Sequence, residues 1–175
     1  MDLRIKYLNE LNGAEIYSLL ENVYSTTDSM SEEFHEKFPD IYSCIGYFEE
    51  ILRLPGGVVL FLEFKGLLCG YVSVKPRHQA KIKHTSELNM GIHSEFRGKG
   101  IGKFLLQNAV DRVQEEGIIE IIYLMVRSDN VPAISLYEKS GFEKLAVLEK
   151  DTKIGNIYLD GILMRKFTGA LNSGK

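Results

Sequence analysis

Residues 86–127 limit the fold more than any other part of the chain, because two strand-like segments there flank an amphipathic helix. The first segment is SELNMGI, and the helix is IGKFLLQNAVDRVQEEG, with apolar side chains at helical spacing before the final Gly117. The second segment, IEIIYLMVR, is almost continuously apolar, as is typical of a strand buried on both faces. This order predicts a helical crossover between two parallel strands.

The other strand-like segments predict mainly antiparallel pairing around that crossover. VVLFLEF and LLCGYVSV are separated only by KG, which is a short hairpin signal. EKLAVLEK and NIYLDGILMRKF flank the turn DTKIG and predict a second pair. LRIKYL, near the beginning of the chain, alternates apolar and charged side chains as a half-buried strand does.

Three more segments carry helical signals. GAEIYSLLENVYS has one apolar face, and a second helical pattern runs from Ser43 to LPGG. NVPAISLYEKSGF begins with Asn130 as an N-cap and has Pro132 in its first turn. The polar segment TTDSMSEEFHEKFPD is interpreted as a long mobile connection, with a helical turn inside it and a role as a lid as open alternatives. The resulting order is βααβββαβαββ, an α/β fold with a mixed, mostly antiparallel central sheet flanked by helices.

Length and composition predict one packed domain. The 175 residues are 45% hydrophobic and 26% charged, which is typical of a globular protein with a sizeable core. No internal repeat or linker divides the sequence. We therefore expect a single domain over residues 1–166 and a frayed tail over residues 167–175.

The same composition argues against several classes of protein. Cys44 and Cys69 both lie in apolar surroundings and predict reduced core thiols, and the four histidines show no metal-ligand spacing. No signal peptide or membrane span is evident, so we expect a cytoplasmic protein without a membrane partner. A net charge of −3 gives no general nucleic-acid footprint.

A local concentration of glycine and basic side chains, EFRGKGIGK, stands out against this acidic background. It is not a P-loop, because Arg97 stands where the first glycine belongs and Phe104 where the hydroxyl belongs. It is not a dinucleotide fingerprint either, because the third glycine would fall at Lys103 or Leu105. What remains is R-x-x-G-x-G between a strand and a helix.

That arrangement predicts a site for a pyrophosphate. The free N–H groups of the first helical turn, the positive end of the helix dipole and three basic side chains would surround the anion. These side chains belong to Arg97, Lys99 and Lys103. The alternative is a glycine-rich turn with solvated lysines.

Two motifs in the expected order resemble the GNAT superfamily of N-acetyltransferases, which use acetyl-CoA. The first is MGIHSEFRGKGIGKFLL and the second is VRSDNVPAISLYEKSGF. The resemblance covers about residues 84–166, and the N-terminal half matches in architecture only. It implies the superfamily's fold, acetyl-CoA as co-substrate and no metal.

Carried over position by position, the resemblance implies specific contacts with acetyl-CoA. The backbone of Met90, Gly91 and Ile92 would pair with the pantetheine arm as an added strand does. Asn130 would hydrogen-bond the same arm, with a plain helix cap as the alternative. The phosphate-binding residues would be Arg97, Gly98, Lys99, Gly100, Ile101, Gly102 and Lys103.

The resemblance also implies how catalysis is divided among residues. Tyr137 would give a proton to the departing thiolate, although a core tyrosine is the alternative interpretation. The identity of the general base stays open. One branch of the superfamily has a glutamate base at the position that is Met125 here, and methionine cannot accept a proton. Glu87 is our candidate base, with an exposed strand charge as the equally weighted alternative. Asp160 and His84 are lesser candidates, and for Asp160 the alternative is a strand-end or bulge residue beside Gly161.

The resulting hypothesis is an enzyme that transfers an acetyl group from acetyl-CoA to a primary amine by direct attack in a ternary complex. The acceptor would be a small molecule or a peptide or protein amine, and its identity stays open, as does homodimer formation. One rival is a CoA-binding sensor with little or no turnover. Another is a nucleic-acid-binding domain built on the basic loop, which predicts salt-sensitive binding.

Overall fold

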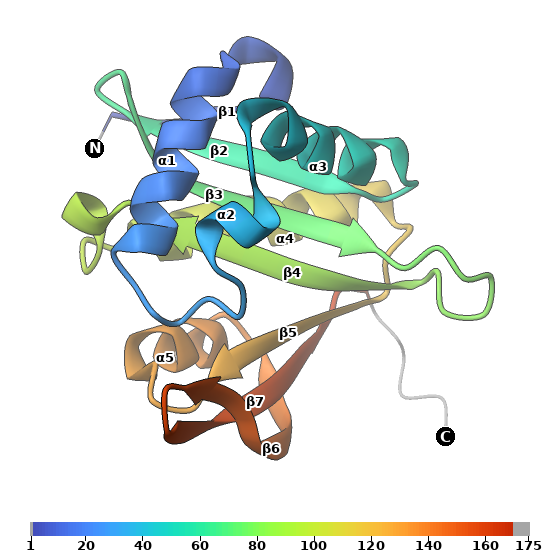
Figure 1. Ribbon diagram of the computed structural model, residues 1–175. Coiled ribbons are helices and arrows are strands. Elements are labelled where there is room, and N and C mark those ends of the chain that lie inside the picture. Colours follow the sequence, from blue (N-terminus) through green and yellow to red (C-terminus); the bar gives the residue numbers. More distant parts are fainter. Residues whose placement is uncertain (1, 170–175) are drawn as a thin grey trace.

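A seven-stranded sheet in the order β1-β2-β3-β4-β5-β7-β6 organises the computed structural model, which describes residues 2–169 (Figure 1). The strands are β1 (Leu3–Lys6), β2 (Val58–Phe64), β3 (Leu67–Pro76), β4 (Thr85–Ile92), β5 (Ile121–Arg127), β6 (Glu143–Ile154) and β7 (Ile157–Phe167). The α-helices are α1 (Gly13–Ser25), α2 (Phe34–Lys37), α3 (Ile41–Arg53), α4 (Ile101–Glu116) and α5 (Val131–Lys139). Two short 3₁₀ helices, η1 (Leu8–Glu10) and η2 (Ser94–Phe96), complete the described elements.

This architecture confirms the predicted α/β fold with a mixed, mostly antiparallel sheet. The pair formed by β4 and β5 is parallel, α4 crosses between them, and the other strand pairs are antiparallel. The single turn α2 forms inside the segment interpreted as a connection, which is the helical turn that the sequence analysis left open. Phe34, the buried residue of this single turn, packs against the rings of Tyr17 and Tyr24, so aromatic contacts stabilise it.

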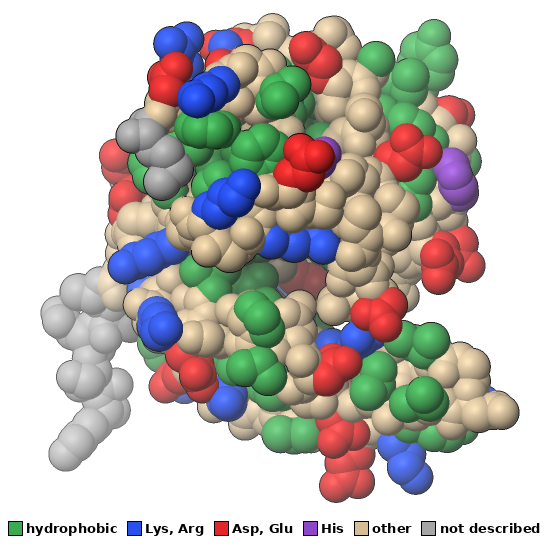
Figure 2. Space-filling model, turned by 90° about the vertical axis from the view of Figure 1, so that its left-hand side faces the viewer, with side chains coloured by type: hydrophobic (Ala, Val, Ile, Leu, Met, Phe, Trp, Pro, Cys, Tyr) green, Lys and Arg blue, Asp and Glu red, His purple; other side chains and the backbone are tan. Residues whose placement is uncertain are grey.

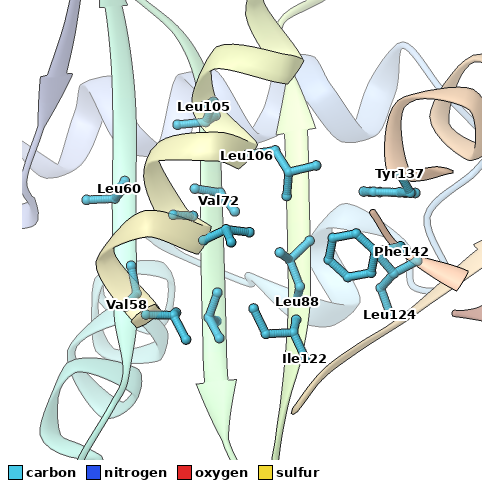
Figure 3. Close-up of a cluster of buried hydrophobic side chains, with 14 of the residues drawn as sticks. Val58, Leu60, Val72, Leu88, Leu105, Leu106, Ile122, Leu124, Tyr137 and Phe142 are labelled. Atoms are coloured by element: carbon cyan, nitrogen blue, oxygen red, sulfur yellow. The ribbon is translucent and has the colours of Figure 1, made fainter. Parts of the chain in front are cut away.

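The sheet is covered on both faces, and alternate residues of each strand supply two hydrophobic clusters. Leu60 and Leu62 of β2 point to the face covered by α4, whereas Val59 and Phe61 point to the face covered by α1 and α3. We call these the α4 face and the α1 face. Figure 3 shows the α4 face, where Leu105 and Leu106 of α4 lie over β2, β3 and β4. A central strand buried on both sides explains the uninterrupted apolar run VVLFL.

The last two strands extend further than the sequence predicts. β6 continues to Ile154, through most of the predicted turn, because its register against β7 shifts between Leu148 and Thr152. At the other end, Phe167 still belongs to β7 and Thr168 is buried, with its N–H donating to the carbonyl of Glu120 at 3.0 Å. The predicted frayed tail therefore does not include residues 167 and 168, and residues 170–175 lie outside the described chain.

Candidate active site

An opening separates β4 from β5 because the two strands pair only at their beginnings. Their parallel register joins residues 85–87 of β4 to residues 121–123 of β5. Beyond Glu87 and Tyr123 the strands diverge, while β4 remains in continuous register with β3 as far as Ile92. Divergence, not a bulge, thus leaves one edge of β4 without a strand partner.

The hydrogen-bond pattern shows which residues face this opening. The N–H of Arg77 donates to the carbonyl of Thr85, and the N–H of His93 to that of Cys69, each at 3.0 Å. In an antiparallel ladder without a bulge, the odd-numbered residues between these positions therefore bond to β3. The even-numbered Met90 and Ile92 direct their backbone groups toward the opening, as an extended ligand would require, although the carbonyl of Ile92 already accepts a hydrogen bond from Nε of Arg97.

Gly91 contributes in a different way, because its backbone faces β3. A Cβ at this position would lie 2.4 Å from Cγ1 of Val23 in α1 and 2.8 Å from Cε1 of Tyr71 in β3. The missing side chain thus lets α1 and the ring of Tyr71 close over β4. Tyr71 is buried, and its hydroxyl donates to Oδ1 of Asn89 at 2.8 Å, which fixes the Asn89 amide beside the opening.

The first turn of α4 lies at the end of the same opening and has no side-chain cap. Gly98 and Gly100 have φ values of 74° and 78°, which side-chain-bearing residues adopt only with strain. No heavy atom lies within 4 Å of a Cβ built on either glycine, so the loop is open to a ligand. The N–H groups of Ile101, Gly102 and Lys103 precede the first helical acceptor bond and point out of the helix end.

The remaining glycine of this loop has a packing role. A Cβ on Gly102 would lie 3.3 Å from Cδ2 of Leu136 in α5 and 3.8 Å from both Met90 and Ile92 in β4. The N-terminus of α4 therefore lies next to both β4 and α5, and only the contact with Leu136 would be tight for a Cβ. This position brings the uncapped N–H groups to the place where β4 and α5 converge.

Arg97 is occupied by the chain itself, unlike Lys99 and Lys103. Its Nε donates to the carbonyl of Ile92 at 2.9 Å, and Nη1 donates to the carbonyl of Thr26 at 2.9 Å. Nη2 donates to Oγ1 of Thr26 at 2.8 Å. The guanidinium thus binds the C-terminal end of α1 to the glycine loop, and the two lysines are left as the exposed cations beside the helix end.

Tyr137 of α5 lies on the α4 face, with its ring directed toward β4 (Figure 3). The ring packs against Phe142, with 5.7 Å between centroids, and burial raises the pKa of Tyr137 to about 12. The hydroxyl makes no hydrogen bond to a described residue. Since no buried polar side-chain atom of the described chain lacks a partner, this hydroxyl reaches solvent, and it stays protonated at neutral pH.

Asn130 is the N-cap of α5, which is compatible both with a plain helix cap and with a contact to the pantetheine arm. Its Oδ1 accepts from the N–H of Ala133 at 3.3 Å. Its amide nitrogen has no partner among residues 2–169, so it can donate to a ligand while the oxygen caps the helix.

The candidate bases differ in their surroundings. Glu87 is exposed on the α1 face, at the last position where β4 pairs with β5, and it forms no ion pair with a described residue. Asp160 is occupied, because its Oδ1 accepts from the N–H of Lys150 at 2.8 Å. His84 precedes β4, and its carbonyl accepts from Glu120 at 2.7 Å. Of the two carboxylates, only Glu87 is free of ion pairs and hydrogen bonds to residues 2–169.

Arg127 is a buried charged residue near the opening that the sequence analysis did not single out. Its side chain is only 6% exposed and forms ion pairs with Asp129 at 2.6 Å and with Asp28 at 2.9 Å. The Arg127 guanidinium holds the pKa of Asp129 below its ordinary value. Because Asp28 lies between α1 and α2, this buried cation anchors their connection over the α1 face beside β5. An arginine ending an apolar strand was the available signal.

The side of the molecule that carries the glycine loop is hollowed, with lysine and arginine side chains along the hollow (Figure 2). Two further surface cavities lie elsewhere: one of about 580 Å³ between η1 and α3, and one of about 320 Å³ beside α2. Neither is lined by the glycine loop or by Tyr137. Among residues 2–169, no helix could span a membrane and no group of three side chains could hold a metal ion.

The features of the opening together define a class of enzyme. A strand edge can pair with an extended arm, an uncapped helix end beside two lysines fits a pyrophosphate, and a protonated phenol faces the other end. Coenzyme A has matching parts in the matching order: a thiol at one end, then an extended pantetheine arm, then a pyrophosphate. The site is therefore that of a transferase that takes an acyl group from a CoA thioester.

Comparison with known proteins specifies the family. The sequence profile of the acetyltransferase (GNAT) family matches residues 15–142. An N-alpha-acetyltransferase of Sulfolobus acidocaldarius is 31% identical over 125 residues, which are 66% of this chain and 70% of the relative. A [ribosomal protein bS18]-alanine N-acetyltransferase of Salmonella typhimurium is 27% identical over 86 residues, 49% of this chain and 57% of that protein.

Solved structures agree on the fold. A GNAT acetyltransferase from Streptococcus pneumoniae superimposes with a TM-score of 0.87 at 24% identity and covers 96% of this chain and 100% of its own. A putative acetyltransferase from Salmonella typhimurium with its cofactor acetyl-CoA gives 0.84 at 21% identity, with coverage of 100% and 99%. The chain belongs to the GNAT family of N-acetyltransferases, and its co-substrate is acetyl-CoA.

Proposed function

We propose that this enzyme acetylates an α-amino group, by direct attack of the amine on acetyl-CoA in a ternary complex. The observation that carries the proposal is the divergence of β4 and β5 beyond Glu87 and Tyr123, which leaves that edge of β4 without a strand partner. The CoA-binding elements and Tyr137 lie on the α4 face, whereas Glu87 and Asn89 belong to the α1 face. The two substrates can therefore approach the reacting carbon from opposite sides of the sheet.

The backbone of β4 supplies the donor for the tetrahedral intermediate. The N–H groups of Met90 and Ile92 face the opening, and an oxyanion between the strands would accept a hydrogen bond from one of them. Such a donor is already oriented before reaction, so stabilising the developing charge costs little reorganisation. This arrangement follows from the divergence of β5 and requires no bulge in β4.

Tyr137 faces the departing sulfur in this arrangement. A phenol with a pKa of about 12 is protonated throughout the physiological range and donates a hydrogen bond to the developing thiolate. Asn130, on the first turn of the same helix, has its amide nitrogen available for the pantetheine arm. Helix α5 thus contributes both groups from one rigid element.

The acceptor's acidity favours an α-amine over a lysine side chain. At pH 7.5, an α-amine with a pKa near 7.8 is about one-third neutral, whereas a lysine amine with a pKa near 10.4 is neutral in about one molecule per thousand. The buried polar residues of the described chain include no carboxylate and no histidine, so no strong base created by burial is present there. The names of the relatives from Sulfolobus and Salmonella agree with an α-amino acceptor.

The test is a free-thiol assay with acetyl-CoA and three groups of acceptors: peptides with a free N-terminus, the same peptides with a blocked N-terminus and a free lysine, and single amino acids. We expect thiol release with free α-amines, and mass spectrometry should locate the acetyl group on the α-nitrogen. Acetylation of the lysine alone would contradict the α-amine proposal. Acetyl-CoA binding without thiol release for any amine would favour the CoA-binding sensor instead.

A further inference from the structure

A second carboxylate lies on the α1 face of the opening, beside the side chain of Met125. A Cβ built on Gly161 of β7 would lie 2.7 Å from Oδ2 of Asp151 and 3.0 Å from Sδ of Met125. The carboxylate of Asp151 and the thioether of Met125 therefore occupy neighbouring positions above the missing side chain of Gly161. Met125 is 42% exposed and lies two residues beyond the last position at which β5 pairs with β4.

The irregular part of β6 brings Asp151 to this position. The register between β6 and β7 shifts between Leu148 and Thr152, so Asp151 belongs to the extra residues of a bulge. Lys150 has a φ of 58°, and its N–H donates to Oδ1 of Asp160 at 2.8 Å, which fixes the backbone just before Asp151. Any side chain at position 161 would displace the carboxylate. The bulge, Asp160 and Gly161 thus all serve to place Asp151 over the sheet.

The charge of Asp151 is not compensated by another described side chain. Its carboxylate is exposed and has no ion pair or hydrogen bond among residues 2–169. The two neighbouring lysines turn to the ring of Tyr158: Nζ of Lys150 lies 5.7 Å from its centroid and Nζ of Lys153 lies 5.1 Å from it. The result is a free carboxylate next to an exposed apolar side chain on the α1 face, beside the part of β5 that diverges from β4.

We propose that Asp151 binds the protonated amino group of the acceptor, with Met125 as the apolar surface under the acceptor's first carbon atoms. The inference rests on the proposed function: Asp151 binds the acceptor as an ammonium ion, which then loses one proton to bulk water and attacks the thioester as the neutral amine. A carboxylate that forms a charge-assisted hydrogen bond with an ammonium selects cationic amines. Asp151 thus acts on the acceptor, and the CoA-binding residues on the opposite face are independent of it.

The test compares Asp151→Asn, Asp151→Glu and the matched control Glu149→Gln, which removes another exposed carboxylate of the same bulge. We expect Asp151→Asn to lower kcat/KM for a free-α-amine peptide about 10- to 100-fold, mainly through KM. The affinity for acetyl-CoA and the melting temperature should stay unchanged. Asp151→Glu should recover part of the loss, and Glu149→Gln should behave as the wild type.

A neutral acceptor distinguishes a loss of charge recognition from a general loss of activity in Asp151→Asn. The arylamine 4-methoxyaniline is uncharged at pH 7.5, so its acetylation should be insensitive to Asp151→Asn. Equal losses for the peptide and the arylamine would overturn the inference, and so would wild-type kinetics of Asp151→Asn with the peptide.

A binding measurement keeps this inference distinct from the proposed function. Calorimetric titration of the CoA-saturated protein with the peptide needs no turnover, and we expect Asp151→Asn to weaken binding about 10-fold or more. If the wild type releases no thiol but binds the peptide through Asp151, the proposed function fails and the inference stands. Peptide binding that is equal in the wild type and in Asp151→Asn would refute the inference.

Discussion

Replacing Tyr137 with Phe isolates the chemistry of one hydroxyl group. The ring keeps its contact with Phe142, whose centroid lies 5.7 Å away, and the hydroxyl makes no hydrogen bond to a described residue. Its removal should therefore change the free energy of unfolding at pH 7 by less than about 0.5 kcal/mol. A large kinetic effect of Tyr137→Phe would then have no structural explanation.

The raised pKa of Tyr137 sets the size of that kinetic effect. A thiol has a pKa near 8.5, so complete proton transfer from a phenol with a pKa of about 12 is uphill by about 5 kcal/mol. Tyr137 therefore stabilises the thiolate chiefly as a hydrogen-bond donor in the transition state. We expect Tyr137→Phe to lower kcat about 100-fold, at the lower end of the range for proton-transfer groups, and to leave the Kd for acetyl-CoA unchanged.

The same pKa predicts a change in alkaline stability. The unfolded state loses the phenolic proton near pH 10, while the folded state retains it until about pH 12. The resulting stabilisation is fully present below pH 10 and is lost as the pH rises to 12, by about 3 kcal/mol. Tyr137→Phe should remove this loss in urea unfolding measured from pH 9 to 12.

Two results would refute this reasoning about Tyr137. The first is a kcat of Tyr137→Phe within about threefold of the wild type in the thiol assay, which would exclude a role in the departure of the thiolate. The second is a loss of more than about 2 kcal/mol of stability at pH 7, which would mean that the hydroxyl is a structural group. Stopped-flow measurement of a single turnover would ensure that the chemical step is observed.

Three other substitutions test separate parts of the structure. Gly100→Val and its control Gly66→Val impose similar backbone strain, because the two glycines have φ values of 78° and 81°. Both substitutions should destabilise the fold by about 1–2 kcal/mol. Only Gly100→Val should weaken acetyl-CoA binding in calorimetry. Gly91→Ala should cost about 1–3 kcal/mol in urea unfolding, and Val23→Ala should recover part of it if their 2.4 Å approach is the cause. Arg127→Met should cost about 1.5–3 kcal/mol and expose the connection between α1 and α2 to limited proteolysis; an unchanged cleavage pattern would contradict the anchoring role.

The strand, glycine loop and helix of the proposed CoA-binding half could be predicted because their signals are contiguous in the sequence. A strand, a glycine loop and a helix follow one another within residues 86–117, so turn chemistry and helix-end electrostatics are visible without a structure. The roles of single residues were less predictable. Arg97 was expected at the phosphates, yet its guanidinium bonds to Thr26, which lies 71 positions away, and local sequence contains no sign of that contact.

The acceptor half could not be predicted for the same physical reason. Its groups come from β4, β5 and a bulge in β6, and they meet only after long-range pairing has fixed the register of each strand. Asp151 was interpreted as part of a turn, because the residues DTKIG carry the usual turn signals. Only the shifted register and the missing side chain of Gly161 bring Asp151 to its place beside Met125, where we propose that it binds the acceptor.

The separation of the two halves has a consequence for specificity. The CoA-binding groups are on the α4 face and Asp151 is on the α1 face, so no described contact couples Gly100 to the bulge in β6. Distant groups without shared partners contribute independently to free energy, so the acceptor can change through the bulge without affecting acetyl-CoA. The fold-losses in kcat/KM should therefore multiply when one substitution on each face is combined. They should not multiply when two substitutions on the same face are combined.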